Sequence, residues 1–317
     1  MKDRTSFEKN AVAEKLRRFF KKQAVQREIA GFLCAAPVIL GILIFTFIPA
    51  VQAFIYSFYD FDGFNTFDFI GWKNYEVLFT FDRDTPYIFK NTFLYALINV
   101  PLGLILGYFL ALLANSKVKG IGIFRTLFYL PCVIPGVASG LLWRDLFNPE
   151  TGIINQLLRA LHLPTSQFFY AASSSMPTLI LTTVFTVGGS MVIWLGAFKN
   201  IPQTLYEAAQ LDGANCFVRL AKITIPLSTP VIFYNLVTGI IGSLQIFSSF
   251  IIAGTSSGKG VDNSLYFIAV KIYNTAFVGT RHQLGYASAI GVILFLIIAV
   301  FTSITFLTNK WVYYTDE

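Results

Sequence analysis

Long apolar runs alternate with short polar links along most of this 317-residue chain. Six runs lack Asp, Glu, Lys and Arg, and they occupy residues 29–59, 91–116, 126–143, 163–198, 223–258 and 282–309. Each can supply the roughly 20 residues with which a helix crosses the hydrocarbon core of a bilayer. Once trimmed at Pro, Gly and polar clusters, the runs predict six membrane helices, near 29–57, 90–114, 121–146, 177–199, 222–252 and 285–309. We expect interruptions at Pro37 and Pro49 in the first, at Pro131 and Pro135 in the third, and at Gly188-Gly189 in the fourth.

Composition supports the same class. Only 13% of the residues are charged and 55% are hydrophobic, whereas about a quarter of a soluble domain is charged. We expect an all-α membrane protein whose six-helix domain covers 29–309, between a basic tail at 1–28 and a short tail at 310–317. The basic tail holds nine Lys or Arg against four acids. Beside a membrane span, this favours cytoplasmic retention and contact with anionic lipid headgroups over binding of nucleic acid.

The charges of the links predict the orientation. The first link is acidic and aromatic, which is typical of an external loop, and its charged residues are Asp60, Asp62, Asp68, Lys73, Glu76, Asp82, Arg83 and Asp84. Two later links are basic and therefore cytoplasmic, with Lys117, Lys119, Lys199, Arg219 and Lys222. Three cations in the last external loop depart from this pattern, namely Lys259, Lys271 and Arg281. Both termini are predicted to be cytoplasmic.

Charged residues are missing from the interiors of all six predicted spans. Proton- and ion-coupled carriers usually keep an ionisable residue at depth despite a cost of at least ~2.5 kcal/mol, so a gradient sensed within this chain is disfavoured. Catalysis is disfavoured too, because His162 and His282 occur singly without a nucleophile or metal-ligand pattern. We interpret Asp82 and Asp84 as a solvated loop face. The segment 254–260 departs from the phosphate-binding loop pattern in spacing and is interpreted as a flexible turn.

The polar residues that remain inside the spans are amides and hydroxyls, which can hydrogen-bond the hydroxyl groups of a sugar. Thr182, Thr186 and Ser190 recur every four positions and so share one face of a helix. We take six residues as candidates for a pathway for a neutral hydrophilic solute, namely Thr182, Thr186, Ser190, Asn235, Ser243 and Gln245. Ordinary helix–helix hydrogen bonds are the alternative interpretation for each of them.

The link at about 200–226 is different in kind, because it can form a helix of its own. Asn200 can cap it, Pro202 suits its first turn, and Gly213 suits a left-handed C-terminal end. These residues frame a helix from Pro202 to Asp212, followed by a sharp turn and a second short helix that ends before Pro226. From these residues alone, an amphipathic connector and a docking element are both open.

At this link the sequence resembles the EAA loop of the permease subunits of binding-protein-dependent ABC importers. The match rests on Glu207-Ala208-Ala209, on Gly213, and on Ile225-Pro226-Leu227. Further stretches resemble the carbohydrate-uptake branch, the maltose- and glycerol-phosphate-type permeases: Phe124-Arg125-Thr126-Leu127, Leu142-Trp143-Arg144, Phe147-Asn148-Pro149 and Leu205 to Ala214. The resemblance covers about residues 28–309. One departure is the Ser-rich segment 254–260, where relatives often have a Gly-Gly-Pro turn, and this leaves docking of a binding protein there in doubt.

The resemblance implies a type I importer permease fold with a cytoplasmic coupling helix between the fourth and fifth spans, in a bacterial or archaeal cytoplasmic membrane. It implies these partners: a second homologous permease, two copies of a cytosolic ABC ATPase, an extracytoplasmic solute-binding protein and a carbohydrate. The chain itself is then not an enzyme and binds no cofactor or metal, since ATP and Mg are held by the ATPase. The residues expected to grip that ATPase are Tyr206, Glu207, Ala208, Ala209, Leu211, Asp212, Gly213 and Ala214.

Two other functions stay open at this point. Within the importer class, the solute can be another hydrophilic compound such as glycerol phosphate, although a phosphate favours basic residues facing the cavity. Outside it, a secondary carrier for a neutral solute is the alternative, and it predicts transport without an ATPase.

Overall fold

The computed structural model describes residues 23–116, 118–278 and 282–313. Expectations that concern residues 1–22, Lys117, Arg281 and residues 314–317 lie outside the described residues. The chain divides into two compact units, residues 1–55 and residues 56–317. Each unit is described by itself.

The described residues of the first unit form one long helical run. Helix α2 (Gln23–Ile42) continues through the π-turn η1 (Leu43–Phe47) into α3 (Ile48–Tyr56). The π-turn ends two residues before Pro49, which has no N–H with which to continue the α-helical ladder. The run from Arg27 to Tyr56 is long and apolar enough to cross a membrane, and it corresponds to the helix expected at 29–57.

The second unit holds two more uninterrupted helices of membrane-crossing length, α5 (Thr85–Ala114) and α17 (Leu284–Leu307). They correspond to the helices expected at 90–114 and 285–309. The structure therefore has three uninterrupted candidate spans among its described residues, or up to six if each of three bent helix pairs counts as one span.

The three bent pairs show where the predicted spans are interrupted. Helices α6 (Ile121–Val133) and α7 (Gly136–Leu146) meet at 101° where one helix was expected at 121–146. The break is at Ile134, which is extended because the ring of Pro135 disfavours helical geometry in the preceding residue. Helices α9 (Ala172–Val184) and α10 (Gly188–Asn200) meet at 40°, so the break expected at Gly188-Gly189 is found beside that pair.

The third pair begins within the polar link. Helix α11 (Gln203–Leu211) is followed by α12 (Cys216–Arg219), the π-turn η4 (Leu220–Thr224) and α13 (Ile225–Leu227). The run Cys216–Leu227 meets α14 (Thr229–Leu244) at 65°. The expectation that the second short helix ends before Pro226 is therefore wrong. The expectation of one helix over 222–252 is wrong as well, since α14 ends at Leu244 and α15 (Ser249–Ile252) is separate.

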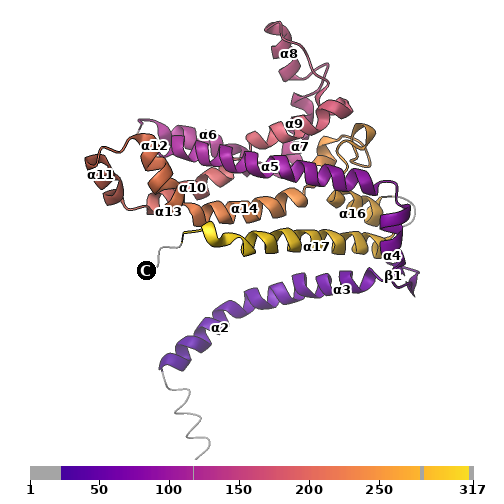
Figure 1. Cartoon of the computed structure of the whole chain (residues 1–317). Helices are drawn as coiled ribbons and strands as arrows, with labels where there is room; N and C mark the ends of the chain where they lie inside the picture. The colour runs from indigo at the N-terminus through magenta and orange to yellow at the C-terminus, as the bar shows by residue number, and fades with distance from the viewer. Residues whose placement is uncertain (1–22, 117, 279–281, 314–317) are drawn as a thin grey trace, which may run out of the picture. The chain divides into compact units, whose positions relative to one another are not determined.

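Within the second unit, α5 packs against α10 and α14, and α17 packs against α14 and α16 (Ile268–Phe277). Figure 1 shows α5, α14 and α17 running side by side, with α11 at one end of this bundle and α4 (Lys73–Glu76) at the other. Two buried clusters fill the bundle. One includes Leu78, Ile88, Tyr266 and Phe267, and the other lies next to the polar link and includes Trp194.

Short elements connect these helices. A hairpin of β1 (Tyr59–Phe61) and β2 (Phe67–Phe69) is antiparallel and leads to α4 and the π-turn η2 (Val77–Phe81). Helix α8 (Ile153–Ala160) and the 3-10 turn η3 (Phe168–Tyr170) lie between α7 and α9, and η5 (Val261–Asn263) precedes α16. The 3-10 turn η6 (Asn309–Trp311) follows α17. The hairpin's turn is fixed by Asp62, whose Oδ1 accepts hydrogen bonds from the N–H groups of Phe64, Asn65 and Thr66.

Candidate functional site

Two adjoining cavities lie inside the bundle of the second unit. The first has a volume of about 600 Å³ and is walled by α5, by the α9–α10 pair and by α14. The second has a volume of about 560 Å³ and adds residues of α6 and α7 to its walls. Tyr95, Thr183, Thr186 and Gly242 belong to both linings. The bends in the α6–α7 and α9–α10 pairs thus occur beside the cavities.

Close helix contacts hold the broken α9–α10 wall in place. A side chain at Gly188 would collide with the carbonyl oxygen of Phe128 in α6, so only glycine allows this approach. Next to it, Cys132 Sγ lies 3.1 Å from the N–H of Gly189 and 3.2 Å from the carbonyl oxygen of Thr186. The broken end of α9 and the start of α10 are therefore both fixed to α6.

The hydroxyl groups of this wall donate to their own backbone. Thr183 Oγ1 donates to Ile180 O at 2.6 Å and Thr186 Oγ1 to Thr183 O at 3.0 Å. Ser190 Oγ donates to Val187 O at 2.8 Å. Since a hydroxyl has one proton and two lone pairs, these oxygens remain acceptors toward the cavity. The wall is thus matched to a solute rich in O–H donors.

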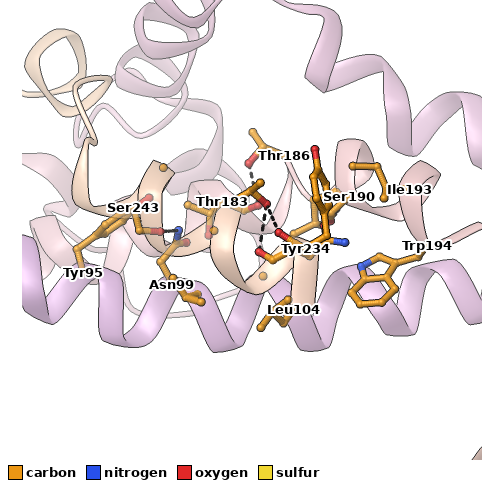
Figure 2. A pocket seen from close by; sticks show the side chains of 17 residues that line it. Tyr95, Asn99, Leu104, Thr183, Thr186, Ser190, Ile193, Trp194, Tyr234 and Ser243 are labelled. Carbon is orange, nitrogen blue, oxygen red and sulfur yellow. Dashed lines mark hydrogen bonds between the residues drawn. The ribbon is translucent and has the colours of Figure 1, made fainter. Parts of the chain in front are cut away.

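A hydrogen bond between Asn99 and Ser243 joins α5 to α14 in the wall of the first cavity. Asn99 Nδ2 donates to Ser243 Oγ at 3.0 Å, and Figure 2 shows this bond together with Thr183, Thr186 and Ser190 around the same space. Asn99 Oδ1 is buried and has no hydrogen-bond partner among the described residues.

All six residues expected along a solute pathway line these cavities. Thr186, Ser190, Asn235 and Ser243 line the first, and Thr182, Thr186 and Gln245 line the second. Thr182, Thr186 and Ser190 do not share one continuous helix face, because the helix breaks between Val184 and Gly188. Six polar or aromatic residues of the first lining lie outside the expected set, namely Tyr95, Asn99, Thr183, Trp194, Tyr234 and Thr238. Asn99 and Thr183 are marked in the sequence by their polarity inside an apolar run, whereas the aromatic residues resemble the many others in the chain.

The cavity walls are neutral. Among the described residues that line the two cavities, none is Asp, Glu, Lys, Arg or His. Aromatic rings of Tyr95, Trp143, Trp194, Tyr234 and Phe247 lie among the hydroxyls and amides. Such walls can hydrogen-bond and stack on a neutral polar solute, and they offer no counter-ion to an anion or a cation.

A second candidate region is the helix α11 at one end of the bundle. Its N-terminal cap is Pro202, and not Asn200 as expected, since Asn200 belongs to α10. Its C-terminal end is a Schellman turn: Gly213 has φ +78°, its N–H donates to Gln210 O at 3.1 Å, and the N–H of Ala214 donates to Ala209 O at 2.8 Å. Asn215 Oδ1 then caps α12 by accepting from the N–H of Val218 at 2.9 Å.

The eight residues expected to grip a partner divide between two faces of this region. Glu207, Ala208, Leu211, Asp212 and Gly213 are exposed. Tyr206, Ala209 and Ala214 are half-buried, and Tyr206 packs against the buried cluster that includes Trp194. Two large apolar side chains project from the exposed face, with Leu211 90% and Phe217 81% exposed.

A third polar region corrects an expectation. Asp82 and Asp84 do not form a solvated loop face, because Lys271 Nζ lies 2.7 Å from Asp82 Oδ2 and 2.9 Å from Asp84 Oδ2. The hydroxyl of Tyr286 donates to Asp82 Oδ2 at 2.6 Å. Lys259 Nζ lies 3.4 Å from Asp84 Oδ2 and 4.5 Å from the ring centre of Tyr266. We call Asp82, Asp84, Lys259, Lys271 and Tyr286 the ionic cluster.

The ionic cluster explains two features of the sequence. Lys259 and Lys271 depart from the expected charge pattern of an external loop, and both are neutralised by acids from the first link. The segment 254–260 is anchored rather than free, because Lys259 pairs with Asp84. Burial raises the pKa of Asp82, but hydrogen bonds from Lys271, Tyr286 and the N–H of Asp84 outweigh this and hold the pKa below its ordinary value of 3.8.

Comparison with known families and proteins gives consistent matches. Residues 99–313 match the model of a family described as "Binding-protein-dependent transport system inner membrane component". The chain is 38% identical over 301 residues to the "Probable ABC transporter permease protein YesP" of Bacillus subtilis (strain 168), covering 94% of the chain and 96% of that relative. It is 29% identical over 283 residues to the "Lactose transport system permease protein LacF" of Rhizobium radiobacter, covering 88% of the chain and 93% of the relative.

A solved structure has the same fold. It is a chain of a bacterial alginate ABC transporter, crystallised in complex with an alginate pentasaccharide-bound periplasmic protein. That chain superposes with a TM-score of 0.78 at 22% sequence identity, covering 92% of this chain and 97% of that one. At this identity the match establishes the fold and leaves the solute to be argued from the residues.

Proposed function

Because the chain belongs to the family of binding-protein-dependent transport system inner membrane components, we propose that it is the permease subunit of an ATP-driven importer for a neutral mono- or oligosaccharide. It forms half of the translocation pathway and receives its energy from a cytosolic ATPase through α11.

Membership of this family confirms three of the sequence-based expectations. The chain is a multi-pass membrane protein with the fold of a type I ABC importer permease. It works with a binding protein, as the description of the family says. It is a non-catalytic subunit, since ATP hydrolysis in this class is carried out by a separate ATPase.

The observation that carries the choice of solute is the neutral, acceptor-rich wall of the two cavities. Relatives are described as permeases for lactose, diacetylchitobiose and trehalose or maltose. A second solved structure of the same fold belongs to a bacterial ABC transporter involved in the import of alginate, an acidic polysaccharide. A uronate or a glycerol phosphate needs a counter-ion on its path, and no cation lines the described cavities here. A neutral sugar needs hydrogen bonds and ring stacking, which Thr186, Asn235 and Tyr234 can provide.

The site residues follow from the same argument. We assign the solute path to Thr182, Thr186, Ser190, Asn235, Ser243 and Gln245, with Asn99 and Thr183 added from the cavity lining. We assign ATPase docking to the exposed face of α11 and its C-terminal turn, and leave Tyr206, which packs against the buried cluster, out of that surface. Leu211 and Phe217 expose apolar surface that is favourable only when a protein partner covers it, and Glu207 and Asp212 give that surface a polar rim.

The assembly and orientation complete the proposal. A second homologous permease forms the other half of the path, two ATPase copies dock on the coupling loops, and both termini are cytoplasmic. The ionic cluster and the β-hairpin then face the side from which the binding protein delivers the sugar. ATP-driven closure of the ATPases biases the bundle between inward- and outward-facing states, so the uncharged path needs no coupling ion.

Affinity purification of the intact chain from its native membrane tests this function. We expect an ATPase and a second permease to copurify with the wild-type chain, and the Glu207→Lys variant to lose the ATPase, because charge reversal alters the rim of the docking surface. The matched control is Gln203→Lys, an equally exposed position on the same helix outside the EAA residues. A chain that purifies alone and moves sugar into liposomes without ATP would show a secondary carrier instead.

A further inference from the structure

We propose that two tyrosine hydroxyls, those of Tyr206 and Tyr108, join the coupling helix to the wall of the cavity and transmit its movement. This inference rests on the proposed function and extends it, because it names the residues through which docking at α11 reaches the solute path. None of these residues needs to touch the ATPase or the sugar. They act as positioning residues.

The first step leads from α11 into the π-turn η4. Tyr206 is half-buried on the inner face of α11, and its hydroxyl lies 2.9 Å from Thr224 Oγ1. Either hydroxyl can be the donor in this bond, since Thr224 Oγ1 also has a longer contact of 3.4 Å with Arg219 O. Thr224 is 6% exposed, so this bond is shielded from water and fixes α11 to the last residue of η4.

The second step crosses the bend between α13 and α14. Ser228 lies at this bend of 65°, and it is fully buried. Ser228 Oγ donates to Ile225 O at 3.0 Å and lies 3.2 Å from the hydroxyl of Tyr108. Either hydroxyl can be the donor in the bond between Tyr108 and Ser228. A helix of the bundle, α5, thereby holds the joint at which the coupling segment turns into a wall of the cavity.

The third step reaches the cavity itself. The ring of Tyr108 meets the ring of Trp194 edge to face, with centroids 5.0 Å apart, and the ring of Phe198 with centroids 5.1 Å apart. Trp194 lines the first cavity and is 1% exposed, and Figure 2 shows it beside Ser190 and Leu104. A shift of the joint at Ser228 therefore acts through Tyr108 on α10, which carries both Trp194 and Ser190.

The indole N–H of Trp194 gives a further reason to expect that the contact between α10 and α5 changes during transport. This N–H is buried and has no acceptor among the described residues. A Cβ built on Gly107 of α5 would lie 3.4 Å from Trp194 Nε1 and 2.5 Å from Ser190 Oγ, so α5 and α10 are in close contact here. A buried donor without an acceptor is costly. A second arrangement of α10 on α5, in which the indole N–H of Trp194 finds an acceptor, would therefore be favoured at this contact. Two such arrangements are what a two-state element requires.

The experiment uses the whole importer, reconstituted with its partner permease, ATPase and loaded binding protein. Tyr108→Phe removes the hydroxyl and keeps the ring against Trp194 and Phe198. Tyr206→Phe does the same at the other step. We expect each variant to keep its assembly and its ATP hydrolysis within about twofold, and to lower sugar transported per ATP about fivefold or more. The double variant should lose little beyond either single variant, because both changes interrupt one connection.

The control is Tyr87→Phe, a half-exposed tyrosine near the opposite end of α5, which should leave the ratio unchanged. A normal ratio of sugar to ATP in both variants would overturn the proposal, as would fully additive losses in the double variant. Loss of assembly in Tyr108→Phe would show a structural role only. Failure of the proposed function is separate, since it would show as a wild-type importer without ATP-dependent sugar uptake.

Discussion

The cavity walls and the ionic cluster are two polar regions of one bundle, and their polar atoms are satisfied in opposite ways. In the cavity, Thr183, Thr186 and Ser190 donate to their own helix and leave acceptors facing the open space. In the cluster, Lys271 and Asp82 neutralise each other, and their side chains are 11% and 10% exposed. The charged residues of the cluster therefore join α16 and two loops at one end of the bundle, whereas the described cavity linings contain no charged residue.

The largest expected effect is a loss of folding stability when the ionic cluster is broken. Lys271→Met leaves two carboxylates close together without their shared cation, and removing one partner of a buried ion pair typically costs about 3–5 kcal/mol. We expect the free energy of unfolding of the purified chain in detergent to fall by that amount, as measured by denaturation. The control is Lys73→Met, an exposed lysine on α4, with an expected change within about 0.5 kcal/mol. Equal stability of the two variants would contradict a structural role for the cluster.

A smaller effect, on the importer's choice of sugar, is expected when a charge is added to the neutral cavity wall. Thr186 lines both cavities and is exposed to them, so Thr186→Lys should fold normally. The new cation should shift the importer's preference from neutral sugars toward uronate oligosaccharides by about tenfold, an energy of about 1.4 kcal/mol. Competition uptake against a neutral sugar measures this ratio. Thr186→Gln is the control for side-chain length, and an identical preference in both variants would show that Thr186 lies off the path.

The smallest expected effect is the pH dependence of the stability that Asp82 contributes. The pKa of Asp82 in the folded protein lies below its ordinary value of 3.8, so its ion pair contributes stability that is fully present above that ordinary value. The contribution is lost as the pH falls through the lower, folded-state pKa. We expect the stability difference between wild type and Asp82→Asn to be constant near neutral pH and to shrink only below about pH 4. A difference that vanishes already near pH 6 would mean that another group controls the cluster.

Much of the coupling region could be predicted from local sequence. Pro202 and Gly213 frame α11 because each residue has a backbone preference that acts over one turn, and the structure places the helix between them. The polar residues of the path were also visible, since hydroxyls and amides inside apolar runs stand out. The cap at Asn200 was wrong because proline at 202 can begin the helix without a side-chain acceptor.

The ionic cluster was missed, and the size of the helix bends could not be predicted, because both depend on contacts between segments that are far apart in the sequence. Lys271 pairs with Asp84 across 187 residues of sequence, and no local pattern reports such a contact. The 101° bend at Ile134 follows from Pro135, yet its size depends on packing in three dimensions. Residues such as Tyr108 and Trp194 are aromatic residues in a chain with 16% aromatic content, so only their contacts distinguish them.

The central claim is that a neutral path moves a neutral sugar with energy supplied by a separate ATPase. The most direct measurement is uptake of labelled oligosaccharides by the importer reconstituted in proteoliposomes, with neutral and uronate sugars compared, and with ATP present or absent inside. We predict uptake of a neutral sugar that requires both ATP and the loaded binding protein. Uptake without ATP, or a preference for the uronate sugar, would contradict the account.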